Sequence, residues 1–194
     1  MYKEIREKIK VGDVIVSSGV GLFAQAIKTV TRSDYTHVSI VINADLGEGL
    51  GKRIMVVEST TSGLDVKLEK VVRGVQMSWL SRQIEIGTAI GERFWLLPLK
   101  QPLSETQIVK LKSYLDGSHL KKYDYHQLLA AGIDIFDKFG LFVNRPDLVS
   151  VFCSELVTAA LLHIDVLPPN INPSEQTPHD VTLFPCFSPL IPLS

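Results

Sequence analysis

The heptapeptide Thr-His-Val-Ser-Ile-Val-Ile at residues 36–42 decides the fold, because large apolar side chains recur at every second position. This period of two is typical of a β-strand that buries one face. We therefore expect Val38, Ile40 and Ile42 on the buried face and His37 on the opposite one. Outward from this segment, further strands are predicted at residues 14–16, 53–58, 63–68 and 92–99.

The second half of the chain shows helical patterns. Ser104-Glu-Thr-Gln107 has the form of a capping box before a helix. A second helix is predicted to begin at Asp124, a third covers residues 152–163, and a Pro-rich tail follows from Leu167. Strands followed by helices favour an α+β fold. The length of 194 residues suits a single domain over 1–194. Helical segments are also expected at 22–32 and around Trp79.

Composition excludes several classes of protein. The 20 Lys and Arg residues nearly balance the 21 Asp and Glu residues, which argues against a nucleic-acid-binding protein. No apolar run approaches the length of a membrane span, and the charged N-terminus lacks the apolar core of a signal peptide. We therefore expect a cytoplasmic protein without a transmembrane segment. No HExxH motif or cluster of His and Cys suggests a metal or another cofactor, and the oligomeric state is left open.

Cys153 is the candidate nucleophile. It lies in Phe152-Cys-Ser-Glu-Leu-Val157, and Ser150 is a plausible N-cap for the predicted helix. That assignment places the thiol in the first helical turn, where free backbone N–H groups and the helix dipole favour a thiolate. The same N–H groups are suited to holding an oxyanion. The alternative is that Cys153 is a small buried apolar residue, as most free cysteines are.

His37 is the candidate base and Glu58 its orienting partner. If residues 36–42 and 53–58 form an antiparallel hairpin with Ile42 opposite Arg53, His37 lies opposite Glu58, about 5 Å away at Cβ. A carboxylate there would fix the tautomer of the imidazole and leave one nitrogen for the thiol. The alternative is a strand-end charge beside a partly buried histidine.

The other histidines are weaker candidates. His163 is ten residues from Cys153 on one predicted helix, roughly 15 Å away. His119 and His126 are interpreted as surface or boundary residues, and His179 in the tail is held in reserve.

Several motifs resemble one family. They are VGDVIV at 11–16, YTHVSIV at 35–41, VVES at 56–59, KYD at 122–124, FCSELV at 152–157 and TPHD at 177–180. In this order they resemble the circularly permuted branch of the NlpC-type papain-like cysteine hydrolases, the YiiX/YebB-like group, which is related to lecithin:retinol acyltransferase-like proteins. The resemblance implies an α+β papain-like fold in which an antiparallel, barrel-like sheet packs against helices, including the cysteine helix.

The resemblance also implies residue roles. Cys153 would be the nucleophile, His37 the general base and then acid, and Glu58 the orienting residue. Tyr35 and Tyr123 are the candidates for substrate contacts, although the Tyr123-Asp124 pair has a more structural character. Residues 71–91 match no part of the family pattern.

The predicted reaction is acyl transfer through a thioester without cofactor or metal. The first choice of substrate is a small peptide or amino-acid amide, as in cell-wall peptides. The alternatives are a lipid acyl amidase, thioesterase or acyltransferase, and a non-enzymatic binding module on the same fold. Trp79, Phe94 and Trp95 are candidates for an acyl pocket, but aromatic residues in a strand more often form ordinary core.

Overall fold

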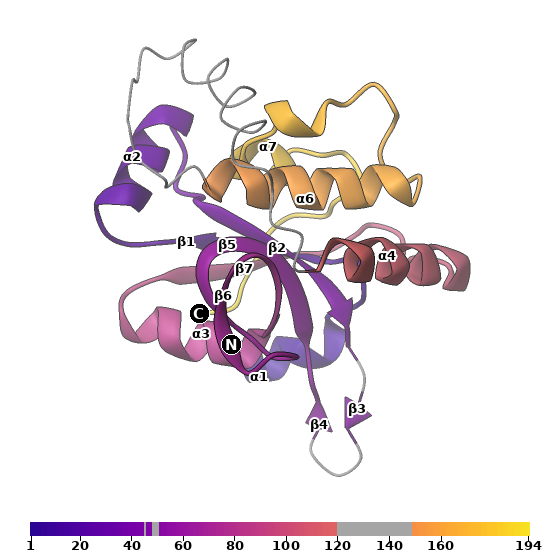
Figure 1. Ribbon diagram of the computed structural model, residues 1–194, viewed down its shortest axis with the longest axis horizontal. Helices are drawn as coiled ribbons and strands as arrows, with labels where there is room; N and C mark the ends of the chain where they lie inside the picture. The colour runs from indigo at the N-terminus through magenta and orange to yellow at the C-terminus, as the bar shows by residue number, and fades with distance from the viewer. Residues whose placement is uncertain (45, 48–50, 120–148) are drawn as a thin grey trace.

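The computed structural model describes residues 1–44, 46–47, 51–119 and 149–194. It is an α+β structure built on a six-stranded antiparallel sheet with the strand order β6-β5-β2-β1-β7-β8 (Figure 1). The six strands are β1 (Val14–Ser18), β2 (His37–Asn43), β5 (Met55–Asp65), β6 (Lys70–Trp79), β7 (Arg93–Leu97) and β8 (Ile191–Pro192). A small separate ladder joins β3 (Leu46–Gly47) to β4 (Gly51–Lys52).

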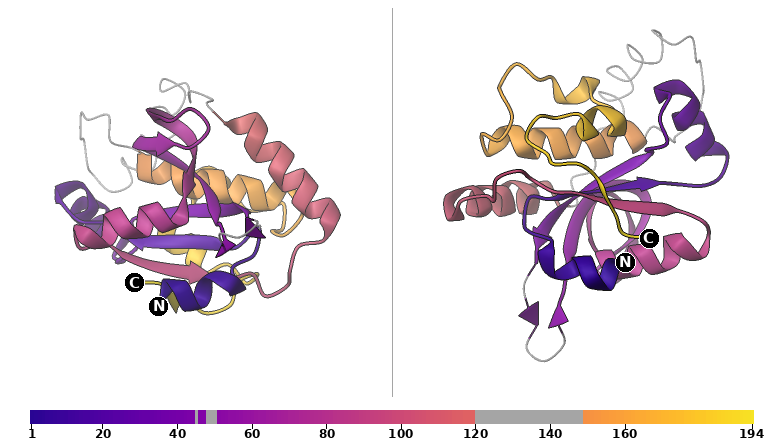
Figure 2. Two further views of the ribbon diagram at one scale, coloured as in Figure 1. Left: turned by 90° about the horizontal axis from the view of Figure 1, so that it is seen from below. Right: turned by 180° about the vertical axis from the view of Figure 1, so that it is seen from behind.

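Helices lie above and below the sheet, as the two further views also show (Figure 2). One side carries α4 (Glu105–Ser118), α6 (Val149–His163) and α7 (Pro178–Thr182). The other side carries α1 (Tyr2–Ile5) and α3 (Leu80–Ala89). The remaining helices are α2 (Leu22–Thr31), η1 (Arg6–Lys8) and η2 (Pro173–Glu175).

Each face of the sheet has its own apolar core. On the α6 side, Val38 and Ile40 of β2 belong to the same buried cluster as Leu156 and Val157 of α6. On the α3 side, Val41 of β2 belongs to a second cluster. This alternation along β2 confirms the predicted period of two, because successive side chains of a strand point to opposite faces. The larger members of the second cluster include Ile9, Ile15, Ile54, Val56, Leu80, Phe94 and Leu96.

The pairing of β2 with β5 differs from the assumed register. Ile40 pairs with Val57 and Val41 with Val56, and a bulge follows before Asn43 pairs with Met55. The expected pairing of residues 42 and 53 is therefore wrong by two positions. A shift of two residues keeps every side chain on its face, so His37 and Glu58 still share one face as predicted.

The elements beyond β2 confirm part of the prediction. The capping box at Ser104 is present, with its side chain accepting from the Gln107 N–H and the Gln107 side chain accepting from the Ser104 N–H. The predicted strand at 63–68 is confirmed only for residues 63–65, because β5 ends at Asp65 and residues 66–69 form the turn before β6 begins at Lys70. Trp79 closes β6, and the helix expected around it starts one residue later. The helix predicted from Asp124 lies outside the described residues.

Candidate active site

His37 and Glu58 are in direct contact. Nε2 of His37 lies 2.8 Å from Oε2 of Glu58. His37 opens β2 and Glu58 lies in the first half of β5, and with the observed register they are diagonal neighbours on one face. Diagonal partners are within reach of long side chains, which explains why the contact forms although the two residues are not directly opposite.

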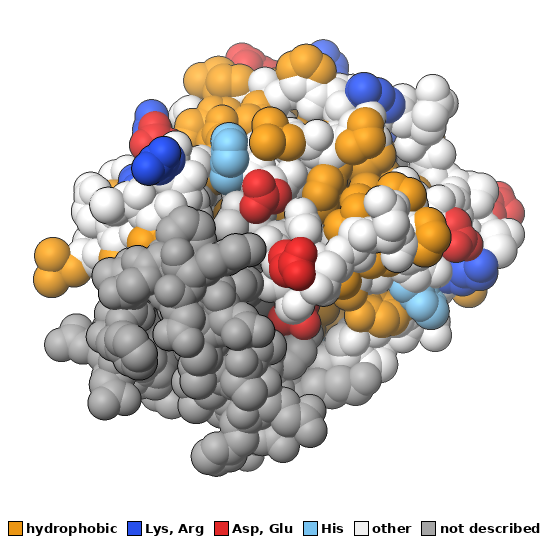
Figure 3. Space-filling model, turned by 90° about the horizontal axis from the view of Figure 1, so that it is seen from above, with side chains coloured by type: hydrophobic (Ala, Val, Ile, Leu, Met, Phe, Trp, Pro, Cys, Tyr) orange, Lys and Arg blue, Asp and Glu red, His pale blue; other side chains and the backbone are white. Residues whose placement is uncertain are grey.

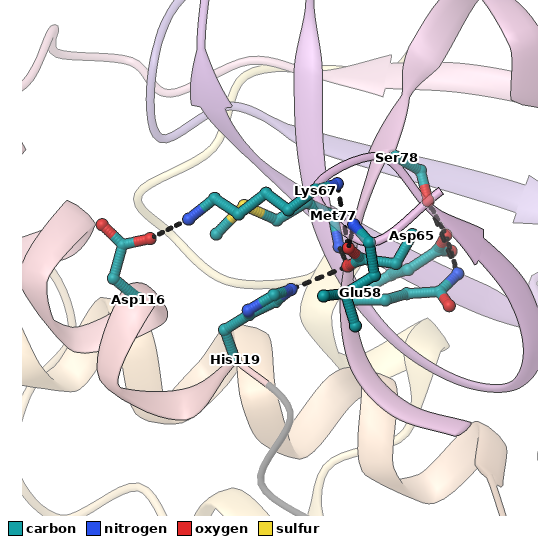
Figure 4. Close-up of polar contacts among 9 residues, drawn as sticks. Glu58, Asp65, Lys67, Met77, Ser78, Asp116 and His119 are labelled. Atoms are coloured by element: carbon teal, nitrogen blue, oxygen red, sulfur yellow. Dashed lines mark hydrogen bonds and ion pairs between the residues drawn. The ribbon is translucent and has the colours of Figure 1, made fainter. Parts of the chain in front are cut away.

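The second carboxylate oxygen of Glu58 has three further donors. Oε1 accepts from Nε2 of Gln76 at 3.1 Å, from Oγ of Ser78 at 2.8 Å and from Nε2 of Gln83. Gln76 is the direct cross-strand partner of Glu58 on β6, and Gln83 reaches it from α3. Figure 4 shows Ser78 pointing at the Glu58 carboxylate. Glu58 is 7% exposed, so these contacts replace water around a buried charge.

The electrostatics of the pair favour the charged forms. Burial alone lowers the pKa of His37, but the neighbouring Cys153 and Glu58 raise that pKa well above its ordinary value. Burial alone raises the pKa of Glu58, but the contacts with His37, Ser78 and Gln76 lower it below its ordinary value. An imidazolium beside a carboxylate is therefore the favoured state of this pair.

Cys153 lies beside the same imidazole. It is a residue of α6, it is 0% exposed, and its side chain interacts with His37 electrostatically and through a hydrogen bond. Residues far apart in the sequence, 37, 58 and 153, thus meet in one place. Cys153 is also part of the apolar cluster on the α6 side. It is therefore a buried core residue and, at the same time, a neighbour of the candidate base.

The start of the cysteine helix differs from the prediction. α6 is described from Val149, so Ser150 lies inside the helix and is not its N-cap. At least four helical residues therefore precede Cys153. Only the first four N–H groups of a helix lack an intrahelical acceptor, so the N–H of Cys153 itself is not among the expected oxyanion donors.

Tyr35 makes two aromatic contacts just before the start of β2. Tyr35, two residues before His37, stacks on His179 of α7 with ring centroids 6.3 Å apart. Tyr35 also meets Trp95 edge-on at 5.4 Å. The tail is tied to the cysteine helix, since Ser154 donates to the carbonyl of Gln176. Tyr123, the other candidate for a substrate contact, lies outside the described residues.

Asp65 and His119 form a second buried polar pair. Nε2 of His119 lies 2.7 Å from Oδ2 of Asp65, whose side chain is fully buried (Figure 4). His119 follows the last residue of α4, and its side chain is 11% exposed. His119 is thus a boundary residue of intermediate burial, as predicted, but its contact with Asp65 was not expected from the sequence. His163, in contrast, stacks on Tyr114 at 4.8 Å.

The sequence missed the residues that surround Glu58. Gln76, Ser78 and Gln83 all lie within 71–91, the segment without a counterpart in the family pattern. Polar and apolar residues alternate along 75–78, which indicates a strand. That pattern does not indicate that β5 is the strand paired with it. Gln83 had no sequence signal, because it meets Glu58 only through the packing of α3.

The described residues contain neither a membrane-spanning helix nor a metal-binding cluster. None of their helices combines the length and the apolar character that a membrane span needs. Over the same residues, no three or more His, Cys, Asp or Glu side chains are grouped as a metal site requires.

Comparison with solved structures identifies the fold. The sequence matches no protein-family model and no curated protein at a significant level. Among solved structures, the chain is similar to the metalloprotein YiiX from Escherichia coli O157:H7, with a TM-score of 0.51 and 20% sequence identity. The similarity covers 94% of this chain and 96% of that one. The chain therefore has a YiiX-like fold.

Proposed function

We propose that this protein is a cysteine-dependent hydrolase of amide bonds, with Cys153, His37 and Glu58 as its catalytic residues. The observation that carries the proposal is the position of His37, which contacts a buried carboxylate at 2.8 Å through Nε2 and hydrogen-bonds to a buried thiol. A nucleophile, a base and a group that orients the base are the minimum set for covalent acyl transfer.

The fold proposed for this chemistry is a circularly permuted papain-like domain. Along the chain the order is histidine, carboxylate, cysteine, whereas ordinary members of the superfamily have the cysteine first. The YiiX-like fold and the packing of the sheet against the cysteine helix support this assignment.

The proposed mechanism uses one proton carrier. With Nε2 held by Glu58, Nδ1 of His37 is the nitrogen available to the thiol. The Cys153 sulfur attacks the carbonyl carbon of the substrate and forms a C–S bond. The imidazolium then gives its proton to the leaving nitrogen as the C–N bond breaks. Water attacks the resulting thioester, His37 takes the proton from that water, and the thiolate leaves with release of the carboxylic acid.

The proposed substrate is a small peptide or an amino-acid amide. Tyr35, stacked on His179 and close to Trp95, provides a polarisable wall two residues from the base. Such aromatic surfaces suit planar amide groups. Tyr123 remains a proposed contact on the strength of the family resemblance.

A lipid acyl substrate is the second candidate, including thioester hydrolysis and transfer of the acyl group to another acceptor. The face above the sheet carries gathered hydrophobic side chains with acidic ones between them (Figure 3). Leu22 and Leu183 are among the large apolar side chains that are exposed, at 92% and 66%. Gathered apolar surface is a feature of ligand-binding grooves and interaction sites, which an acyl chain would suit.

A binding module without activity is the third candidate, and the full burial of Cys153 favours it.

The structural neighbour is described as a metalloprotein. Cys153, His37 and Glu58 are potential ligands, but in the described residues they are not grouped as a metal site. His37 uses Nε2 for Glu58, and Glu58 is saturated by neutral donors. The donor set does not fit a metal ion, and no step of the mechanism uses one.

Alkylation of the two cysteines across pH tests the proposal. Burial raises the pKa of Cys186 to about 11, so this thiol should react only at high pH and marks the behaviour of a buried, unactivated cysteine. With iodoacetamide and peptide mass spectrometry, Cys153 is expected to react at a pH below the ordinary thiol pKa of about 8.5, and His37→Ala is expected to move its reaction to about that pH or above. If Cys153 reacts only after unfolding in urea, the hydrolase assignment is wrong and the binding module is favoured.

Substrate class is tested with fluorogenic aminoacyl amides beside acyl thioesters. Turnover by the wild type is expected on amides, with no turnover by Cys153→Ala and a loss of about 10²–10⁴-fold in His37→Ala. Turnover of thioesters alone would replace the amide assignment with the lipid one.

A further inference from the structure

The hydrogen bonds of Glu58 are divided unequally between its two oxygens. Among the described residues, His37 is the hydrogen-bond partner of Oε2, whereas Oε1 accepts from Gln76, Ser78 and Gln83. We propose that these three residues are positioning residues, which hold Glu58 as an anion with one oxygen reserved for His37. The inference deepens the proposed function and rests on it for its catalytic consequence. We call the three residues the Glu58 clamp.

The first argument is the cost of burying this charge. Glu58 is 7% exposed, and Gln76 and Ser78 are 1% and 6% exposed. A buried carboxylate becomes protonated unless donors stabilise its charged form. All three donors of the clamp are neutral, so they stabilise the anion without competing with the imidazolium for the role of counter-ion.

The second argument is geometric. Gln76 faces Glu58 across the β5–β6 pair, and Ser78 lies two residues further along the same face. Gln83 comes from α3, on the side of the sheet that carries the second apolar core. Donors from a strand and from a helix fix the carboxylate in more than one direction, so rotation that would move Oε2 away from the imidazole breaks several contacts at once.

The third argument comes from Gln76 itself. Its carbonyl oxygen is buried and has no hydrogen-bond partner in the described residues. Turning the amide over would bring that oxygen against the carboxylate of Glu58, which is repulsive. The donor orientation is therefore kept although one buried acceptor is left unsatisfied, which is unusual for an interior amide.

The alternative is that the three residues merely fill space around a buried charge. Titration distinguishes the two roles. If the clamp keeps Glu58 ionised, loss of a donor raises the pH at which Glu58 takes up a proton. If it only fills space, loss of a donor lowers stability and leaves that titration where it was.

The experiment follows the His37 ring by NMR in the full-length protein with labelled histidine, and assigns its signal by its loss in His37→Ala. The protonation of Glu58 should appear as an acidic inflection of that signal, because the two groups are in contact. Glu92 also interacts electrostatically with both groups, and burial raises its pKa, so every variant is made in a Glu92→Gln background to remove that second inflection. In Ser78→Ala and in Gln83→Ala this inflection is expected to move up by about one pH unit. Ser78→Thr keeps the hydroxyl and should restore the wild-type inflection.

Gln25→Ala is the matched control, because it removes an exposed amide from α2 and should leave the inflection unchanged. Thermal melting is recorded for each variant. An unmoved inflection in folded Ser78→Ala and Gln83→Ala would overturn the clamp.

The pH dependence of Cys153 alkylation distinguishes the clamp from the proposed function. If both are right, the fall in alkylation rate at acidic pH shifts in Ser78→Ala and Gln83→Ala by the same amount as the Glu58 inflection. If the inflection moves but Cys153 of the wild type is no more reactive than Cys186, the clamp is right and the hydrolase assignment is wrong.

Discussion

Replacement of Asp65 by alanine should destabilise the fold strongly. The Asp65 carboxylate accepts from the backbone N–H groups of Lys67, Leu68 and Met77 and from the ring of His119. The N–H groups of Lys67 and Leu68 belong to exposed residues and can turn to water. Met77 is 1% exposed and the His119 side chain 11%, so these two donors are stranded. At about 1–3 kcal/mol for each stranded donor, the expected loss is about 2–6 kcal/mol.

Chemical and thermal unfolding measure this loss. For the middle of the range, Tm should fall by roughly 8–16 °C in a domain of this size. Asp116→Ala is the matched control, because Asp116 is 53% exposed and forms a surface ion pair with Lys67 at 2.8 Å. Such pairs contribute about 0–1 kcal/mol. If Asp65→Ala costs no more than Asp116→Ala, the reasoning about stranded donors is refuted.

The effect of Asp65 should also depend on pH. Burial alone raises the pKa of Asp65, but the contacts with Met77, His119 and Leu68 lower it below its ordinary value. A group with a lowered pKa stabilises the fold above its unfolded-state pKa, about 3.9, and this contribution is lost as the pH falls through the folded-state pKa. The difference in free energy of unfolding between wild type and Asp65→Asn should therefore be largest near neutral pH and shrink below about pH 4.

Four further substitutions test the packing and one helix cap. Cys153→Ser should retain the fold, with a loss below about 1.5 kcal/mol by thermal melting, because the hydroxyl keeps a hydrogen-bonding group beside the imidazole; a larger loss would mean that the thiol is mainly core. Gly87→Ala should cost about 1–3 kcal/mol in urea, since the new Cβ would lie 2.6 Å from Cζ of Phe94. Gly117→Ala, with open space at its Cβ, should instead be neutral or stabilising by up to about 1 kcal/mol. Ser104→Ala should cost about 1 kcal/mol through loss of the capping box, and an unchanged midpoint would contradict that role.

Local patterns were good predictors where one side chain follows another within a single element. The alternation in residues 36–42 predicted the two faces of β2, and Ser104 with Gln107 predicted the start of α4. The contact of His37 with Glu58 was predicted on a register that is wrong by two residues. The prediction of the contact survived because an even shift preserves the face, and because both side chains are long enough to meet diagonally.

Long-range packing was beyond the reach of those patterns. His119 was interpreted as a surface or boundary residue because its partner, Asp65, is 54 positions away. Gln83 meets Glu58 only because α3 packs beneath the sheet, and no periodicity encodes that meeting. Ser150 has the chemistry of an N-cap, but it lies inside the helix and at least four helical residues precede Cys153, which the local pattern did not indicate.

The sequence by itself determined the α+β class, the faces of the central strand and the thiol, imidazole and carboxylate as the residues to examine, because these follow from side-chain chemistry and periods of two or 3.6 residues. Tertiary structure alone decided the register at the β2–β5 bulge, the full burial of Cys153 and the three donors on Glu58. Those features depend on how separate elements pack, and the free energy of that packing is shared among residues that no local pattern connects.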